Sequence, residues 1–133
     1  ITLMWNAGST NGISIPISRI GDSGGAETTG YVSAAHARDG AGSARATATD
    51  GFLLNYDSAA ANVLYATLVI TLVDAATFLW HAHGAYYETA TSSGRIGVLS
   101  GSKALSAALT TIHLTTQNGT DTTDAGSLNC MWE

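Results

Sequence analysis

The chain has few cysteine, proline and charged residues. Among its 133 residues there is one cysteine and one proline. A lone cysteine excludes an intrachain disulfide, and with it the cysteine-rich secreted scaffolds. Cys130 alternates with Leu128 and Trp132, so we expect it to be a small buried core residue and not a nucleophile. The length fits one domain that folds without a disulfide or a structural metal.

Charge is also scarce. Charged residues make up 11% of the chain, against roughly 25% in an ordinary soluble domain. Five Lys and Arg against ten Asp and Glu give a net charge of -5, and so few scattered cations argue against nucleic acid as a partner. Neutral polar faces can instead pack on neighbouring subunits. We therefore expect a homo-oligomer, with a trimer favoured.

No run is apolar enough to be a membrane span. The longest apolar stretch, residues 62–80, is interrupted by three threonines and Asp74. We expect no membrane partner. The sequence has no initiator methionine and no basic leader, so a signal peptide is absent, removed or outside it, and whether Ile1 is the native N-terminus stays open.

What the sequence does have is alternation of apolar and polar residues between turns rich in Gly, Asn, Asp and Ser. Nine segments are strand-like: 2–6, 13–20, 30–37, 45–49, 62–73, 77–89, 95–100, 109–116 and 128–132. They predict one all-β domain over residues 1–133, an antiparallel β-sandwich of jelly-roll type with long Gly- and Ser-rich loops in the N-terminal half. An extended N-terminal arm over residues 1–30 is the main alternative.

Residues 62–73 are apolar on both faces, which predicts a central strand or one covered by another subunit. A helix over residues 57–66, capped by Asp57 and Ser58, is the competing interpretation. At the end of the chain, residues 108–116 and 128–132 read as two strands joined by the turn-forming residues 117–121. We expect them to form a closing β-hairpin.

This C-terminal quarter carries a resemblance. Ile112-His113-Leu114, a polar loop and then the run 123–129, Thr-Asp-Ala-Gly-Ser-Leu-Asn, resemble the ending of many tailed-phage virion proteins. Those proteins finish with an I-x-L strand, a polar loop and the motif F-D-[AS]-G-[ST]-[IL]-N. Thr123 replaces the usual Phe, and the chain ends in Met-Trp-Glu where an Ile- and Tyr-rich run is usual. The resemblance implies a small β-sandwich or jelly-roll module used in virion decoration, collars or tail fibres.

Two strings match the trypsin-like proteases letter for letter, Gly-Asp-Ser-Gly-Gly at 21–25 and Val-Ser-Ala-Ala-His at 32–36. In that family the His string precedes the Ser string, and the two meet between two β-barrels. Here the order is reversed, only about ten residues separate Ser23 from His36, and the chain is too short for two barrels. We assign no catalytic residue to either string.

A metal site is the second chemical alternative. His81, His83 and Glu88 resemble half of the first cupin motif, and two histidines at alternate strand positions point to one side about 7 Å apart. His113 is a candidate third nitrogen ligand. The flanking glycines and the second cupin motif are missing, so we expect surface or subunit-interface histidines, and we assign no catalytic, cofactor or metal-binding residue.

These observations together predict a non-enzymatic virion structural protein without a cofactor. We expect capsid decoration or cementing first, with the major capsid protein or another virion protein as partner. A receptor- or glycan-binding fibre domain is the alternative, because exposed aromatic rings can stack on sugars. A cupin-like metalloprotein comes third. Asn118 lies in a formal glycosylation sequon, which we interpret as a hairpin loop. The position in the virion, the symmetry and the ligand stay open.

Overall fold

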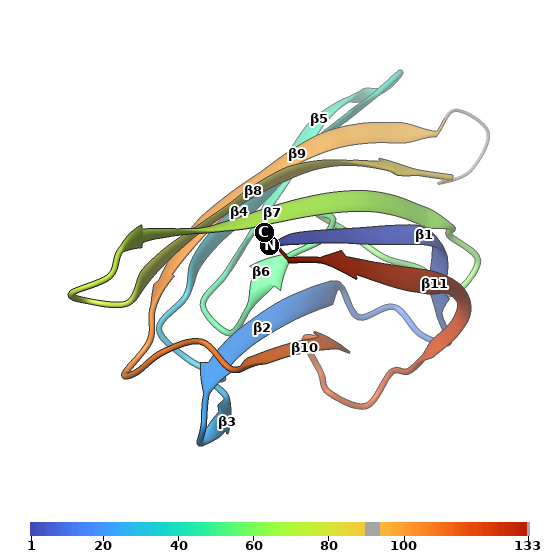
Figure 1. Ribbon diagram of the computed structural model, residues 1–133. Helices are drawn as coiled ribbons and strands as arrows, with labels where there is room; N and C mark the ends of the chain where they lie inside the picture. Colours follow the sequence, from blue (N-terminus) through green and yellow to red (C-terminus); the bar gives the residue numbers. More distant parts are fainter. Residues whose placement is uncertain (90–93, 133) are drawn as a thin grey trace.

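The protein is a sandwich of two antiparallel β-sheets (Figure 1). The computed structural model describes residues 1–89 and 94–132. Over these residues the chain forms strands and no helix, so the predicted all-β sandwich is confirmed. Within the same ranges, nothing helical is long and apolar enough to cross a bilayer.

Seven strands make the larger sheet, in the order β11-β1-β7-β8-β9-β4-β5, and four make the smaller one, in which β2 pairs with β10, β3 and β6. The strands are β1 (Thr2–Thr10), β2 (Pro16–Asp22), β3 (Gly25–Ala26), β4 (Val32–Asp39), β5 (Gly42–Ala48), β6 (Phe52–Leu53), β7 (Leu64–Asp74), β8 (Leu79–Glu88), β9 (Arg95–Ala104), β10 (Thr111–Thr116) and β11 (Thr123–Met131). Each of the nine segments expected from the sequence overlaps one of these strands, and β3 and β6 are additional two-residue strands.

The core lies between the two sheets. From β7, every second side chain points inward and is buried, namely Leu64, Ala66, Leu68 and Ile70. Ile17 of β2 and Phe52 of β6 meet them from the smaller sheet. The competing helix over residues 57–66 is wrong, because residues 57–63 form neither helix nor strand and β7 begins at Leu64. The place of β7 between β1 and β8 confirms that it is a central strand.

The N-terminal segment is part of the sandwich, so the alternative of an extended arm over residues 1–30 is wrong. β1 is the second strand of the larger sheet, and β2 lies inside the smaller one. Leu3, Trp5, Ile17 and Ile20 are all buried. Burial of these four apolar side chains stabilises the fold, whereas an arm extended in solvent would leave them exposed to water.

The predicted C-terminal hairpin is also wrong. β10 pairs with β2 in the smaller sheet, whereas β11 pairs with β1 in the larger one. The connection between them therefore crosses from one sheet to the other (Figure 1). Its turn residues are held by the opposite loop, since Asp121 accepts a hydrogen bond from the Ser14 amide at 2.9 Å and Ser14 Oγ accepts one from the Asn118 amide at 3.0 Å. Turn-forming residues predict that the chain reverses direction. They do not predict which strand the next segment pairs with.

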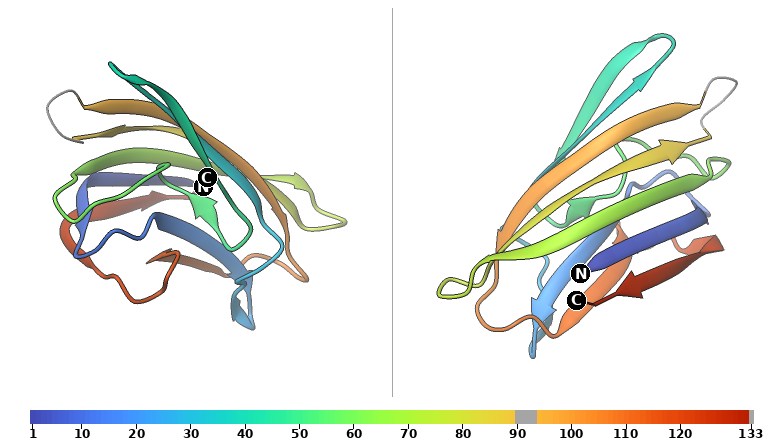
Figure 2. Two further views of the ribbon diagram at one scale, coloured as in Figure 1. Left: turned by 180° about the vertical axis from the view of Figure 1, so that it is seen from behind. Right: turned by 45° about the horizontal axis from the view of Figure 1, so that its top comes forward.

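Because seven strands face four, the larger sheet overhangs the smaller one at both edges. Every residue of β11 is exposed, and in β5 all but Ala46 and Ala48 are. The β4–β5 hairpin projects beyond the sandwich at the top of the right-hand view in Figure 2. The overhang explains why Cys130 is exposed and not buried as expected. Its side chain has the orientation of a core residue, but the smaller sheet does not extend over it.

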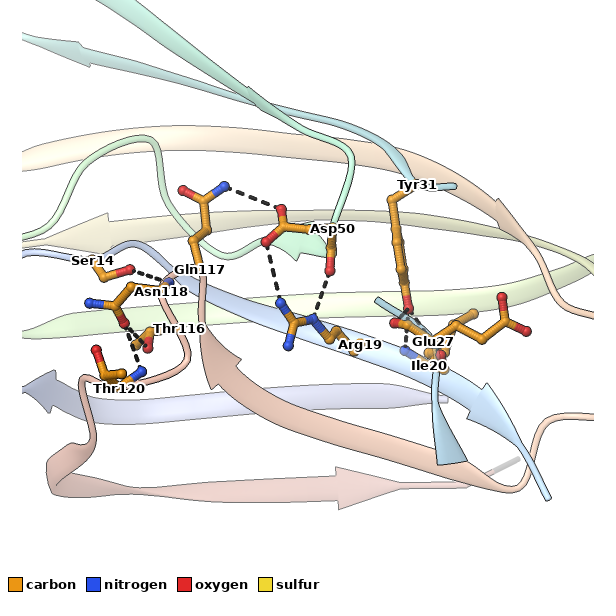
Figure 3. Close-up of polar contacts among 10 residues, drawn as sticks. All are labelled: Ser14, Arg19, Ile20, Glu27, Tyr31, Asp50, Thr116, Gln117, Asn118 and Thr120. Atoms are coloured by element: carbon orange, nitrogen blue, oxygen red, sulfur yellow. Dashed lines mark hydrogen bonds and ion pairs between the residues drawn. The ribbon is translucent and has the colours of Figure 1, made fainter. Parts of the chain in front are cut away.

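Polar side chains tie the two layers together (Figure 3). The hydroxyl of Tyr31, which is buried, accepts a hydrogen bond from the Ile20 amide at 2.8 Å and lies 2.9 Å from the Ile20 carbonyl oxygen. Burial raises the pKa of this hydroxyl to about 12. Asp50 accepts from Arg19 of β2 at 3.3 Å and from Gln117, after β10, at 3.3 Å. These contacts fix the smaller sheet against the larger one.

Candidate functional site

The outer face of the larger sheet is its side turned away from the core, and it is open to solvent. The strand registers align its residues in four rows across β7, β8, β9, β4 and β5. The rows are Thr71, His81, Ser102 and Val32; Val69, His83, Ser100, Ala34 and Thr47; Thr67, Ala85, Val98, His36 and Arg45; and Tyr65, Tyr87, Ile96, Arg38 and Ser43. We call these positions the outer face.

The outer face carries positive charge and no carboxylate, although the chain is acidic overall. Arg38 and Arg45 lie on it side by side with His36, because β4 and β5 pair His36 with Arg45. In the described part of the chain neither arginine forms an ion pair, whereas Arg19, Arg95 and Lys103 all do. The two arginines without a carboxylate partner are thus gathered on one face.

Large apolar side chains lie beside these cations. Ile96 is 65% and Val98 60% exposed on β9, and Tyr87 of β8 is 45% exposed. The rings of Tyr65 and Tyr87 lie 6.2 Å apart between centroids, tilted by 36°. We call the large or charged residues of the third and fourth rows the outer patch. Its residues are Tyr65, Tyr87, Ile96, Val98, His36, Arg38 and Arg45.

Two shallow hollows flank Val98 within the outer patch. One, of about 520 Å³, is lined by His36, Arg38 and Ile96 among others, and the other, of about 320 Å³, by His36, Arg45 and Val98. Ala34 and Ala85, which point to the outer face, leave this space because their side chains are too small to fill it. The patch therefore offers both a cationic centre and depressions beside it.

His81 and His83 lie on the outer face, as their alternation predicts. Their rings stack with centroids 5.5 Å apart, and His81 Nε2 is 3.1 Å from Ser100 Oγ. Glu88 points to the opposite, buried side of β8, and His113 is exposed on β10 of the other sheet. The structure thus brings together two of the four residues of the cupin-like hypothesis and separates the other two. Among the described residues, no three His, Cys, Asp or Glu side chains cluster as metal ligands.

The protease-like strings are likewise apart. Ser23 lies in the turn between β2 and β3 of the smaller sheet, and His36 lies on the outer face of β4 in the larger one. The Asp22 carboxylate accepts hydrogen bonds from the Gly24 amide and from Ser106, which lower its pKa. These contacts give the Gly-rich string a turn-forming role.

A buried ionic cluster lies at the end of β8, on the core side. Glu88 is 1% exposed, and its Oε1 accepts hydrogen bonds from the side-chain amides of Asn55 at 3.1 Å and Asn62 at 3.0 Å. Arg95 Nη1 lies 3.5 Å from Glu88 Oε2 and 3.2 Å from Asp57 Oδ2. The ring of Tyr56 covers the guanidinium, with 5.0 Å from its centroid to Arg95 Cζ.

Burial raises the pKa of the Glu88 carboxyl, while the Asn62 hydrogen bond and the charge of Arg95 act in the opposite direction. A buried carboxyl with a perturbed pKa is a common mark of a catalytic acid. The hollow beside this cluster, about 210 Å³, is lined by Asp39 and Tyr56 and not by Glu88. The cluster therefore holds β8, β9 and the loop with Asn55 together, and its carboxyl does not face the nearby hollow as a catalytic acid would.

An apolar pocket of about 620 Å³ opens at the other end of the larger sheet. Phe78, Trp80, Leu109 and Trp132 are among its lining residues. The indole N–H of Trp80 is buried and has no hydrogen-bond partner among the described residues. The pocket adjoins the exposed end of β11.

The sequence identified the outer-face histidines but missed the outer patch. The alternation of residues 77–89 places Tyr87 and His83 on one side, and that signal was present. The gathering of Arg38, Arg45 and Tyr87 depends on which strands are neighbours. β9 lies between β8 and β4, an order that alternation within each strand does not encode.

The geometry defines a class, a β-sandwich with one covered and one open face on its larger sheet. No protein-family model, curated protein or solved structure matches this chain. The outer patch and the resemblance in the C-terminal quarter are therefore the basis for a functional proposal.

Proposed function

We propose that the chain is a non-enzymatic virion structural module of the capsid-decoration kind, which docks through its outer patch on a carboxylate-bearing surface of the capsid protein. The observation that carries the proposal is the open outer face, on which two arginines without carboxylate partners lie beside exposed apolar side chains. The resemblance of residues 112–129 to tailed-phage virion proteins supports the virion context.

The composition of the patch fits association with a protein surface. Exposed Tyr87, Ile96 and Val98 supply apolar area, and the arginine fork forms bidentate pairs with carboxylates. An acidic chain whose two arginines without ion pairs lie on one face is also oriented by an anionic partner before contact. The docked face then excludes water around Arg38 and Arg45, where ion pairs are stronger than in solvent.

Co-sedimentation with capsids of the virus that encodes the chain tests this proposal. We expect saturable binding to heads that weakens as salt rises, since exposed charge pairs are screened. The double variant Arg38→Glu with Arg45→Glu should lose binding. His113→Glu adds a negative charge to the smaller sheet and is the matched control, which should bind as the parent does.

A second candidate function is glycan binding by a fibre or spike domain, favoured by the exposed Tyr65 and Tyr87 rings. Aromatic faces with polar neighbours suit the apolar faces of sugar rings. Saturable binding on a glycan array that is lost in Tyr87→Ala, together with no binding to heads, would replace the decoration proposal with this one.

A further inference from the structure

We infer that β11 is a self-pairing edge, which joins the larger sheets of two copies of this chain across a two-fold axis near Asn129. β11 is the outermost strand of its sheet and pairs with β1 on one side only. A strand in that position presents unpaired backbone N–H and C=O groups, the template for strand addition. The inference goes beyond the proposed function, because it concerns the isolated chain.

The burial of side chains changes abruptly between β1 and β11. Trp5 is opposite Leu128 and Leu3 is opposite Cys130, and all four point to the core side. Trp5 and Leu3 are 4% and 3% exposed, whereas Leu128 is 41% exposed and Cys130 is exposed too. The smaller sheet thus stops beneath β1 and leaves the apolar side of β11 uncovered.

β11 also exposes apolar side chains beyond its core side, although Ser127 and Asn129 on its outer side are polar. Met131, on the outer side, is 47% exposed, and Trp132, immediately after the strand, is 64% exposed. The run 127–131 contains no charged residue and no proline, the features that keep most edge strands from pairing. The opposite edge differs, since β5 carries Arg45 and no large apolar side chain.

The regular part of β11 determines the register. Residues 127–131 pair with β1 without interruption, and the irregularities lie before them, between Asn6 and Thr10 of β1. Antiparallel pairing of this run with its own copy places Asn129 opposite Asn129 of the partner subunit. Leu128 then faces Cys130 of the partner subunit on the core side, and Met131 faces Ser127 of the partner subunit on the outer side. Each copy contributes the same contacts, as a closed two-fold interface requires.

Sedimentation of the purified chain over a range of concentrations tests this inference. We expect a concentration-dependent shift from 13.6 kDa to twice that mass and to no higher species. A trimer, which the sequence favoured, or a monomer at all concentrations up to the millimolar range would overturn it.

Leu128→Lys places an ammonium group in the proposed interface and should raise the dissociation constant roughly tenfold or more. Thr47→Lys, an exposed position on β5, is the matched control at the opposite edge and should leave dimerisation unchanged. Because both positions are exposed, neither change removes a core contact, and circular dichroism checks the fold. Equal behaviour of the two variants would contradict the inference.

Cross-linking tests the register. In a Cys130→Ser background, Asn129→Cys should form an intermolecular disulfide under mild oxidation, because a residue on the two-fold axis faces its own copy. Ser127→Cys faces Met131 of the partner subunit in this register and should cross-link far less. The reverse order of yields would overturn the placement of the axis at Asn129.

Discussion

The two faces of the larger sheet are built from the same strands and serve different ends. On β8, Tyr86 and Tyr87 are consecutive and identical, yet Tyr86 is 4% exposed and packs in the core while Tyr87 is 45% exposed on the outer patch. The core side holds the buried carboxyl Glu88 with its amide and guanidinium partners. The outer side has arginines without such partners. Alternation therefore lets one strand specify both packing and a surface, with little interference between them.

The largest expected effect is a difference in the free energy of unfolding between variants of these two tyrosines. Tyr86→Ala should lower the free energy of unfolding by about 4 kcal/mol, because it removes a buried aromatic ring and leaves a cavity. Tyr87→Ala should change it by about 0.5 kcal/mol or less. Urea unfolding of both variants measures the difference.

Tyr86→Phe is the control. The Tyr86 hydroxyl is buried near the Tyr56 backbone and forms no hydrogen bond of good geometry among the described residues, so its removal should cost far less than removal of the ring. Equal losses in Tyr86→Ala and Tyr87→Ala would show that the two faces are not independent.

The second prediction concerns the ionic cluster of the core side. Glu88→Ala should cost about 3 kcal/mol of unfolding free energy, since Asn55, Asn62 and Arg95 all lose a buried partner. Asp74→Ala, which removes an exposed turn carboxylate, should cost much less. Thermal and urea denaturation give both values, and a milder effect at Glu88 than at Asp74 would contradict the role given to the cluster.

The third prediction concerns the glycine under Tyr86. A Cβ at Gly97 would lie 2.3 Å from the Tyr86 ring and 2.4 Å from the backbone oxygen of His36, so Gly97→Ala should cost about 2 kcal/mol. Gly40→Ala is the matched control, because nothing lies within 4 Å of a Cβ there. Comparable unfolding midpoints for the two variants would show that Tyr86 moves aside without cost.

The smallest expected effect is a pH dependence. Burial raises the pKa of the Glu88 carboxyl above its ordinary value of 4.5, so the folded state holds this proton more tightly than the unfolded state does. The stability that this protonation adds is fully present below pH 4.5 and is lost as the pH rises through the folded-state pKa. The stability of the parent relative to Glu88→Gln should therefore increase as the pH falls from 7 towards 4.5. An unchanged difference between the two proteins would contradict the raised pKa.

The β-sandwich and all nine longer strands follow from alternation and turn residues alone. Pairing does not, because the six residues between β10 and β11 allow either a hairpin or a crossing between sheets, and contacts of Asp121 and Asn118 with the loop at Ser14 accompany the crossing. The same limit explains Cys130. Alternation gives the direction of its side chain correctly, but its exposure depends on how far the smaller sheet extends.

The outer patch shows this limit at the candidate site. Its histidine and tyrosine members could be assigned to one side of their strands, but Arg38 meets Ile96 only because β4 lies next to β9. Strand order depends on the packing of the whole domain. The residue pattern within a single strand carries no information about it.

The pairing of β1 with β11 has a consequence for folding. Thr2 is opposite Met131, so this pairing joins segments separated by nearly the whole chain. Closing so long a loop carries a large entropic cost, and contacts of such sequence separation slow folding. During synthesis β1 emerges early and is itself a bare edge until β11 follows. The exposed backbone of β1 is then open to other nascent chains, and pairing with β11 closes this edge.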